Sequence, residues 1–411
     1  MPVNYGETNY LVASGLYAGW QASIPSWGKE RLRVVGQVVI GSENSNIGST
    51  AGNYNSILGG AANTIGSGVQ TSTIINGFIN YINGGSYNLV GNAEASIING
   101  GIKNCILGGK YNAISTNAGY NTILNGNGVT ISSGVIYSTV VNGFNNILGP
   151  GINRSTICNG DSNTINHNDC FIGGGFNNLI TASSQGNNII LGGGLNTIGS
   201  GVSFSCIGNG FMNVIETATC SSIVGGVSNT ILSSHGFIGA GNENYINTGS
   251  SYATVAGGYQ NRANAQFSSI PGGNRASTTR YGELAHAAGY FEFEEGSAQH
   301  SIFVLRGKTT SGSQTTTLGL NGTTTSRLTV ASGFILSGTI NIVGSISTGA
   351  NVARYVRQFT IKNVGGTTSL VGSIITLGTD EAAGTTISIT ADNTNDALQI
   401  NVTRAASETW R

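Results

Sequence analysis

The chain has 411 residues, of which 65 are glycine, only 4 are proline and 8% are charged. Its 17 basic and 17 acidic residues give a formal net charge of zero, which argues against nucleic acid or an anionic membrane as a partner. The hydrophobic fraction of 39%, much of it isoleucine and valine, excludes a disordered chain and favours short strands joined by glycine turns.

Residues 1–36 form a segment that lacks the repeat of the following region. No basic start followed by an apolar core is present, so we expect no secretion signal, no membrane insertion and synthesis in a cytoplasm. Aromatic residues beside basic ones favour docking on another protein, with capping of the first coil as the alternative. The predicted docking residues are Trp20, Trp27, Arg31 and Arg33.

Residues 37–277 repeat a ten-residue pattern whose copies mostly begin 14 to 19 residues apart, commonly 17. Ser56–Ile65 and Thr73–Ile82 align without gaps. The unit is too short for a helical hairpin or a propeller blade and too rich in glycine for a helix. We therefore predict a parallel β-solenoid of the β-roll type, in which two strands and two turns make one coil of about 17 residues.

Four positions of the pattern have an assigned role inside the coil. The second and tenth positions, such as Ile57 and Ile65, are predicted to form the core. The fifth position is glycine, which suits a left-handed or crowded backbone, and asparagine at the eighth can hydrogen-bond from coil to coil. In the copy that we align to begin at Cys170, the second, fifth and eighth positions are Phe171, Gly174 and Asn177.

The third position should face away from the core, because side chains alternate along a strand. It is apolar through most of the repeat, and a patch of this size is too large for a soluble monomer to leave exposed. A threefold arrangement suits a rod that buries one face along an axis, with a dimer as the alternative. The predicted trimer-interface residues are Leu58, Ile75, Leu107, Leu124, Val141, Ile172, Leu191 and Val224.

No catalytic, cofactor or metal site is predicted. The cysteines lack metal-ligand spacing, and three of them are interpreted as small packing residues of the coil. The scattered acidic residues do not recur as the carboxylate pair that glycoside hydrolysis requires. The packing cysteines are Cys105, Cys170 and Cys206. A further acidic cluster, interpreted as a solvated turn, comprises Glu292, Glu294 and Glu295 near His286 and His300.

Two resemblances follow from these residues. The short coils with small residues, glycine and asparagine resemble the head repeats of trimeric autotransporter adhesins, which implies trimeric β-rolls, although the signal peptide and membrane anchor of those adhesins are missing. Within the junction at 278–307, Tyr281–Tyr290 and Gly296–Arg306 resemble a junction in bacteriophage and prophage tail-fibre proteins. The second resemblance extends to the C-terminal module and implies a structural role in a virion, with no catalytic residue to carry over.

Residues 308–411 lose the repeat and alternate apolar with polar residues over short stretches separated by turns. This pattern predicts an antiparallel β-sandwich that serves as a tip or as a second docking module. The predicted strands lie at 326–330, 339–343, 355–361, 369–377, 385–390 and 397–402.

The sequence thus predicts an all-β homotrimer that is a fibre- or spike-type component of a phage particle, located in the virion and assembled in the host cytoplasm. Expected partners are other virion structural proteins and a host surface receptor or glycan. No enzymatic activity and no cofactor are expected. The alternatives are a capsid decoration or stabilising protein and a polysaccharide depolymerase.

Overall fold

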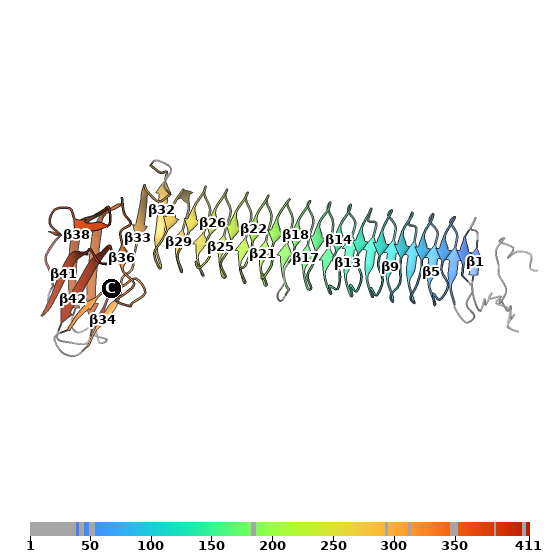
Figure 1. Cartoon of the computed structure of the whole chain (residues 1–411), viewed down its shortest axis with the longest axis horizontal. Helices are drawn as coiled ribbons and strands as arrows, with labels where there is room; N and C mark the ends of the chain where they lie inside the picture. Colours follow the sequence, from blue (N-terminus) through green and yellow to red (C-terminus); the bar gives the residue numbers. More distant parts are fainter. Residues whose placement is uncertain are drawn as a thin grey trace, which may run out of the picture. The chain divides into compact units, whose positions relative to one another are not determined.

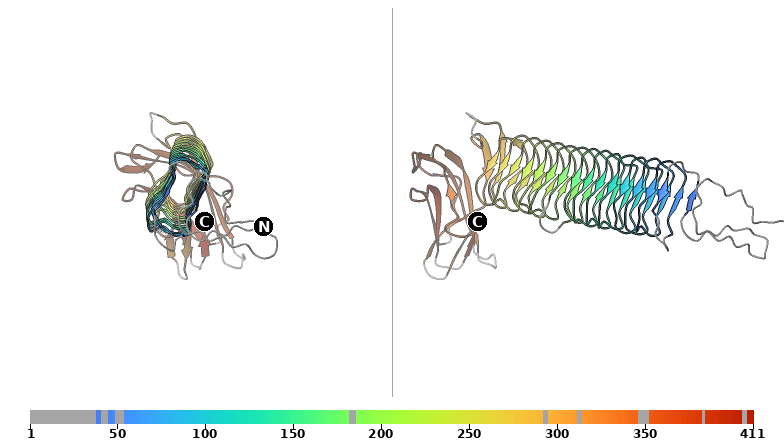
Figure 2. Two further views of the ribbon diagram at one scale, coloured as in Figure 1. Left: turned by 90° about the vertical axis from the view of Figure 1, so that its right-hand side faces the viewer. Right: turned by 45° about the vertical axis from the view of Figure 1, so that its right-hand side comes forward.

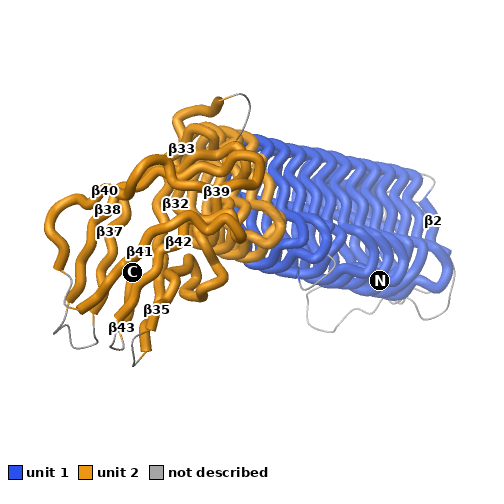
Figure 3. The backbone as a smooth tube through the Cα atoms, turned by 60° about the vertical axis from the view of Figure 1, so that its left-hand side comes forward, with its two compact units in different colours: residues 1–228 blue, residues 229–411 orange. Residues whose placement is uncertain are grey.

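The computed structural model describes residues 38–40, 45–48, 54–181, 186–291, 295–310, 314–345, 352–381, 384–404 and 408–411. Every regular element in these ranges is a β-strand (Figure 1), so no described helix could cross a membrane. The chain divides into two compact units, residues 1–228 and 229–411 (Figure 3), which are taken one at a time below. The predicted docking residues Trp20, Trp27, Arg31 and Arg33 lie outside the described residues.

The predicted parallel β-solenoid is confirmed, with about 14 turns (Figure 2). In the first unit, each coil contributes one strand to a first sheet and one to a second sheet. The strands of the first sheet are β1 (Val38–Ile40), β3 (Ser56–Leu58), β5 (Thr73–Ile75), β7 (Leu89–Gly91), β9 (Cys105–Leu107), β11 (Thr122–Leu124), β13 (Thr139–Val141), β15 (Thr156–Ile157), β17 (Phe171–Ile172), β19 (Ile189–Ile190), β21 (Cys206–Ile207) and β23 (Ser222–Ile223). Those of the second sheet are β2 (Asn46–Ile47), β4 (Thr64–Ile65), β6 (Tyr81–Ile82), β8 (Ile97–Ile98), β10 (Ala113–Ile114), β12 (Thr130–Ile131), β14 (Ile147–Leu148), β16 (Thr164–Ile165), β18 (Leu179–Ile180), β20 (Thr197–Ile198) and β22 (Val214–Ile215).

Two columns of β-branched residues form the core of the coils. Ile57 pairs with Ile74 in the first sheet, and Ile65 pairs with Ile82 in the second. All four side chains are fully buried. The predicted second and tenth positions are therefore confirmed as the two walls of the core. Hydrogen bonds between equivalent residues of neighbouring coils span 15 to 18 positions, in agreement with the predicted coil length.

The eighth position forms the predicted asparagine ladder. Asn163 Nδ2 donates to Asn146 Oδ1 at 3.2 Å, and Asn163 Oδ1 accepts hydrogen bonds from both the backbone N–H and the side-chain Nδ2 of Asn178. Asn163 Nδ2 also donates to the carbonyl of Gly175 at 3.0 Å. Each buried amide thus satisfies backbone groups that the adjacent turns leave unpaired, which makes the ladder a structural requirement of the coil.

A second polar ladder precedes the strands of the first sheet and was not predicted. Asn104 Nδ2 donates to the carbonyl of Ala118 at 2.9 Å, and Asn104 Oδ1 accepts from the backbone N–H of Asn121 at 3.2 Å. The sequence contains a signal for this ladder, because the two halves of a coil carry similar tripeptides: Asn63-Thr-Ile before one turn and Ser72-Thr-Ile after it. Each coil is therefore built from two similar halves.

One copy of the repeat is shifted by one residue from its predicted alignment. Phe171 pairs with Thr156, and Ile172 pairs with Ile157, so Ile172 occupies the second position and is fully buried. The prediction that Ile172 faces outwards was wrong. A slip of one residue moves a side chain to the other face of a strand, and two adjacent large apolar residues made both registers plausible. The fifth and eighth positions move as well, to Gly175 and Asn178 from the predicted Gly174 and Asn177.

The second unit begins with further coils and then changes its pairing. Strand β32 (Leu284–Ala288) pairs in parallel with β29 (Ser269–Ile270) and antiparallel with β33 (Gln299–Ile302). Parallel stacking therefore stops at β32. The other strands of these coils are β24 (Thr230–Ile231), β25 (Phe237–Ile238), β26 (Tyr245–Ile246), β27 (Thr254–Val255), β28 (Arg262–Ala263), β30 (Gly273–Asn274) and β31 (Ser277–Thr278).

Two antiparallel sheets complete the second unit, as the alternating pattern predicts. Buried residues from both sheets, among them Ile342, Phe359, Ile400 and Val402, belong to one hydrophobic cluster. The larger sheet contains β34 (Gly307–Thr309), β37 (Ile335–Ser345), β38 (Val352–Val364), β39 (Thr367–Leu370), β40 (Ile375–Thr376) and β43 (Glu408–Trp410). The smaller sheet contains β35 (Gln314–Thr317), β36 (Leu328–Thr329), β41 (Thr385–Asp392) and β42 (Ala397–Arg404).

Candidate functional site

Aliphatic side chains at the third position line the outside of the first sheet and form what we call the outer apolar column, which is interrupted at Gly91, Cys158, Gly173 and Gly208. Leu107 is 38% exposed and Leu191 is 56% exposed, although both are large apolar residues. Leu107 also covers Gly91 of the preceding coil. Of the predicted interface residues, Leu58, Ile75, Leu107, Leu191 and Val224 are exposed, Leu124 and Val141 are half-buried, and only Ile172 points into the coil.

The equivalent position in the other half of the coils, directly after the second-sheet strand, is polar or glycine in every described coil except the one with Leu232. Asn83 and Asn99 occupy it in two successive coils, and their exposed amides are joined by a 3.1 Å hydrogen bond. Ser115 and Ser132 follow at the same position. The two halves of a coil share their core pattern, so the difference on the outside reflects different surroundings. Water suits the polar face, whereas the outer apolar column needs an apolar cover.

A row of exposed aromatic side chains lies at the corner before the first-sheet strands and was missed from the sequence. Tyr120 and Tyr137 stack with ring centroids 4.8 Å apart, at φ values of 58° and 56°. In the second unit, Tyr252 stacks on Phe267 at 5.0 Å. A bulky residue at positive φ costs roughly 1–2 kcal/mol, so these rings occupy positions that glycine or asparagine would fill more easily. The only sequence signal was tyrosine directly before asparagine or serine.

Two pairs of opposite charges bridge neighbouring coils of the first unit. Lys110 Nζ lies 2.7 Å from Glu94 Oε1, and Arg154 Nε lies 2.6 Å from Asp169 Oδ1, each pair bridging neighbouring coils. The Arg154 guanidinium keeps the pKa of the Asp169 carboxyl below its usual value. Among the described residues, no three histidine, cysteine or acidic side chains group closely enough to hold a metal ion. In the predicted acidic turn, Glu295 forms an ion pair with Arg262, and residues 292–294 lie outside the described residues. The two nearby histidines, His286 and His300, lie opposite each other on β32 and β33.

The five cysteines are free thiols. Burial raises the pKa of the Cys170 thiol to about 11, and it also raises the pKa of Cys105 and of Cys206. A thiol with a raised pKa is a poor nucleophile and a poor metal ligand at neutral pH. Cys105 and Cys206 are half-buried at the first position of their strands. Cys170 lies one position earlier than predicted, because its copy is shifted by one residue, and there its backbone N–H donates to Ser155 Oγ at 3.2 Å in the second polar ladder.

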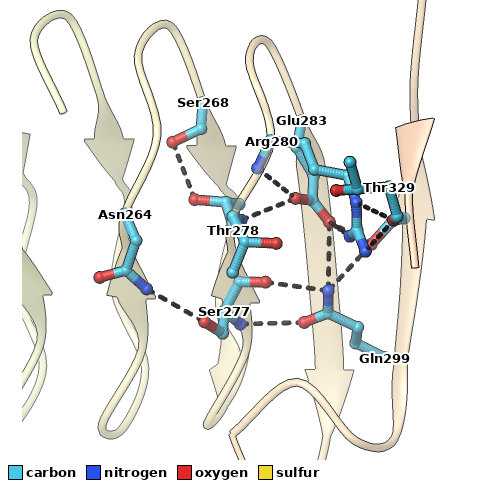
Figure 4. Close-up of polar contacts among 10 residues, drawn as sticks. Asn264, Ser268, Ser277, Thr278, Arg280, Glu283, Gln299 and Thr329 are labelled. Carbon is cyan, nitrogen blue, oxygen red and sulfur yellow. Dashed lines mark hydrogen bonds and ion pairs between the residues drawn. The ribbon is translucent and has the colours of Figure 1, made fainter. Parts of the chain in front are cut away.

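A buried carboxylate fixes the end of the coils in the second unit (Figure 4). The Glu283 side chain is fully buried, and its Oε2 accepts from the backbone N–H of Thr279 at 2.9 Å and of Arg280 at 3.1 Å. Its Oε1 accepts from Ser301 Oγ at 2.7 Å and from Gln299 Nε2 at 3.2 Å. Four hydrogen-bond donors therefore surround one carboxylate, and Arg280 Nη1 lies 3.8 Å from its Oε1. The arrangement is structural, because every oxygen is already engaged.

Glu283→Gln is expected to lower the free energy of unfolding by roughly 1.5–3 kcal/mol, because an amide N–H would face donors that now bond to an oxygen. Thermal unfolding and hydrogen exchange at the amides of Thr279 and Arg280 would measure this loss. The matched control is Glu243→Gln, since Glu243 is exposed and accepts a bond from Gln260 at 2.6 Å. Equal effects of the two substitutions would contradict a structural role for the buried carboxylate.

Comparison with known proteins gives little beyond this geometry. No protein-family model matches the chain, and no curated protein matches it. Among solved structures, the tailspike protein of Acinetobacter phage vB_ApiP_P1 is similar over 91% of this chain and 80% of that chain, with 12% sequence identity and a TM-score of 0.25. At this TM-score the likeness carries no argument about function.

Proposed function

We propose that this chain is a structural component of a bacteriophage particle, a homotrimeric fibre or spike that contributes to host attachment. The observation that carries the proposal is the contrast between the outer apolar column and the polar position equivalent to it. An aliphatic column that follows one sheet from coil to coil is suited to burial against sister copies of the same rod.

The energetics support association along the rod. Burying the exposed part of one leucine of the column stabilises the assembly by roughly 1–2 kcal/mol. A comparable contribution recurs at the exposed Leu58, Ile75, Leu191 and Val224 and in each copy, so the sum over a trimer favours association against its entropic penalty. The row of aromatic side chains at the adjacent corner extends the apolar area of the same face.

The virion assignment has a separate basis. Tyr281–Arg306 resembles the junction of bacteriophage tail-fibre proteins, and the two antiparallel sheets follow it at the place where such proteins carry their C-terminal module. We assign the N-terminal segment to docking on other virion proteins and the C-terminal sheets to contact with a host receptor or glycan.

The trimer is tested by replacing Leu107 and Leu124 together with asparagine. Each copy would lose two buried leucines, or roughly 6–12 kcal/mol per trimer, so the variant is expected to sediment as a monomer where the wild type sediments as a trimer. Analytical ultracentrifugation measures both. The matched control is the replacement of Ser115 and Ser132 with asparagine, which introduces the same side chains on the polar face and should leave the trimer intact.

A wild-type chain that sediments as a well-folded monomer would overturn the proposal, and a dimer would overturn its threefold form. Host attachment is tested separately by deleting residues 308–411 from the protein on the particle. If adsorption is unchanged while particles still assemble, the C-terminal sheets do not recognise the host.

A further inference from the structure

One edge of the larger C-terminal sheet is only partly paired. Strand β37 pairs with β38 over its whole length, but on its other edge β43 covers only Gly344 and Ser345. Beside them, Val343 exchanges two backbone hydrogen bonds with Arg411, at 2.9 Å and 3.1 Å. None of the described residues provides a backbone partner on this edge between Ile335 and Asn341.

The direction of the free backbone groups follows from this pairing. Hydrogen-bonded residues alternate along an antiparallel strand, and Val343 bonds towards β43. Ser337, Thr339 and Asn341 have the same parity, so their N–H and C=O groups point to the same open edge. The result is a row of unpaired donors and acceptors, which is a template for another strand.

A cavity lies beside this edge, lined by apolar side chains of the two sheets and also by polar ones such as Arg280, Gln299 and His300. It has a volume of about 900 Å³, and its lining includes the β37 residues from 335 to 343 together with Arg411. Phe303, Leu305, Phe334, Leu336 and Ile340, which also line it, are only partly buried although they pack against the hydrophobic cluster of the two sheets. The apolar side chains of this module are thus incompletely covered along the edge where the backbone is unpaired.

We propose that the open edge of β37 accepts one more polypeptide strand, antiparallel to β37 and in line with β43, with apolar side chains at alternate positions that fill the cavity. The unpaired backbone groups select an extended peptide over a small apolar molecule, because only a strand satisfies a row of donors and acceptors. Residues alternate their direction along a strand, so every second side chain of the incoming peptide enters the cavity. The inference does not depend on the proposed function.

The test uses the full chain and a synthetic peptide of about nine residues with valine at alternate positions and threonine or lysine between them. Binding is measured by calorimetry, and hydrogen exchange is followed at the amides of Ser337 and Thr339. We expect saturable binding and exchange slowed at least roughly tenfold at both amides. A second peptide, methylated on the backbone nitrogens that face β37, should bind at least roughly tenfold more weakly, because it keeps the apolar side chains but loses the hydrogen bonds.

Two variants locate the site. Thr339→Pro removes an N–H from the open edge and leaves the ladder to β38 intact, whereas Thr339→Val keeps the N–H and should bind as the wild type does. Leu336→Lys alters the cavity and retains the backbone edge, so it keeps the test decisive if the proline variant does not fold. Both Thr339→Pro and Leu336→Lys are expected to weaken binding at least roughly tenfold.

Three outcomes would overturn the inference. Equal affinity for the methylated peptide would show apolar adsorption without strand addition. Absence of binding, while the amides of Ser337 and Thr339 exchange freely, would show that the edge does not accept a strand. Slow exchange at these amides in the chain alone would show that the edge is already covered.

Discussion

Asn163→Asp is expected to destabilise the coils around it by roughly 3–5 kcal/mol. Asn163 Nδ2 faces three oxygens, namely Asn146 Oδ1 at 3.2 Å and the carbonyls of Asn159 at 3.3 Å and Gly175 at 3.0 Å. A carboxylate oxygen in place of this nitrogen would face three acceptors without a donor. The side chain is fully buried, so water cannot compensate.

The loss should depend on pH. Burial and the surrounding oxygens disfavour the charged form, so the pKa of the introduced carboxyl group is raised in the folded chain above its unfolded value of about 3.9. The variant is therefore least destabilised below about pH 4 and loses stability as the pH rises through the folded pKa. Urea unfolding at about pH 4 and at about pH 8 measures this difference, with hydrogen exchange of β15 to β18 as the local readout.

The matched control is Asn166→Asp. Asn166 belongs to the same coil but is exposed on the polar face, so the same change should alter the free energy of unfolding by less than about 0.5 kcal/mol at either pH. If the two variants unfold alike, the ladder does not carry the stability that its hydrogen bonds indicate.

Gly160→Ala is expected to destabilise the solenoid by more than about 4 kcal/mol. Gly160 has a φ of 106°, and a Cβ atom there would overlap the carbonyl oxygen of Gly175 and Nδ2 of Asn163. The backbone of the next coil would have to move, and the asparagine ladder would move with it. A shift of one coil is felt by its neighbours, because each coil packs only against the adjacent ones.

Gly151→Ala separates the two causes. Gly151 also has a positive φ, of 71°, but no atom lies within 4 Å of the position of its Cβ. This substitution should cost only the backbone strain, roughly 1–2 kcal/mol. Thermal unfolding of both variants at one protein concentration measures the difference. Similar melting temperatures would show that contact with the neighbouring coil is not the reason for glycine at the fifth position.

The repeat made most of the solenoid predictable. Isoleucine in the second and tenth positions, glycine in the fifth and asparagine in the eighth each have one physical role that recurs in most coils, so a deviation in a single copy does not hide the pattern. The copy at Cys170 shows the limit, because Phe171 and Ile172 both suit a core position. Only the backbone pairing of Ile172 with Ile157 settles which one points inwards.

Other features could not be read from local pattern. The second polar ladder mixes asparagine with serine, and the aromatic row is irregular in spacing, so neither produced a clear period. The four donors around Glu283 come from its own turn and from β33, and this convergence depends on how the coils end.

What the sequence by itself determined was the coil: its length, the residues of its core and the apolar character of its third position, since these follow from strand alternation and from the demands of tight turns. The tertiary structure decided the rest. It fixed the register of each strand and showed that the position equivalent to the third is mostly polar or glycine on the other half of the coil. Among the described residues, it also left one edge of β37 only partly paired. These properties arise from contacts between segments distant in the chain, which no local pattern specifies.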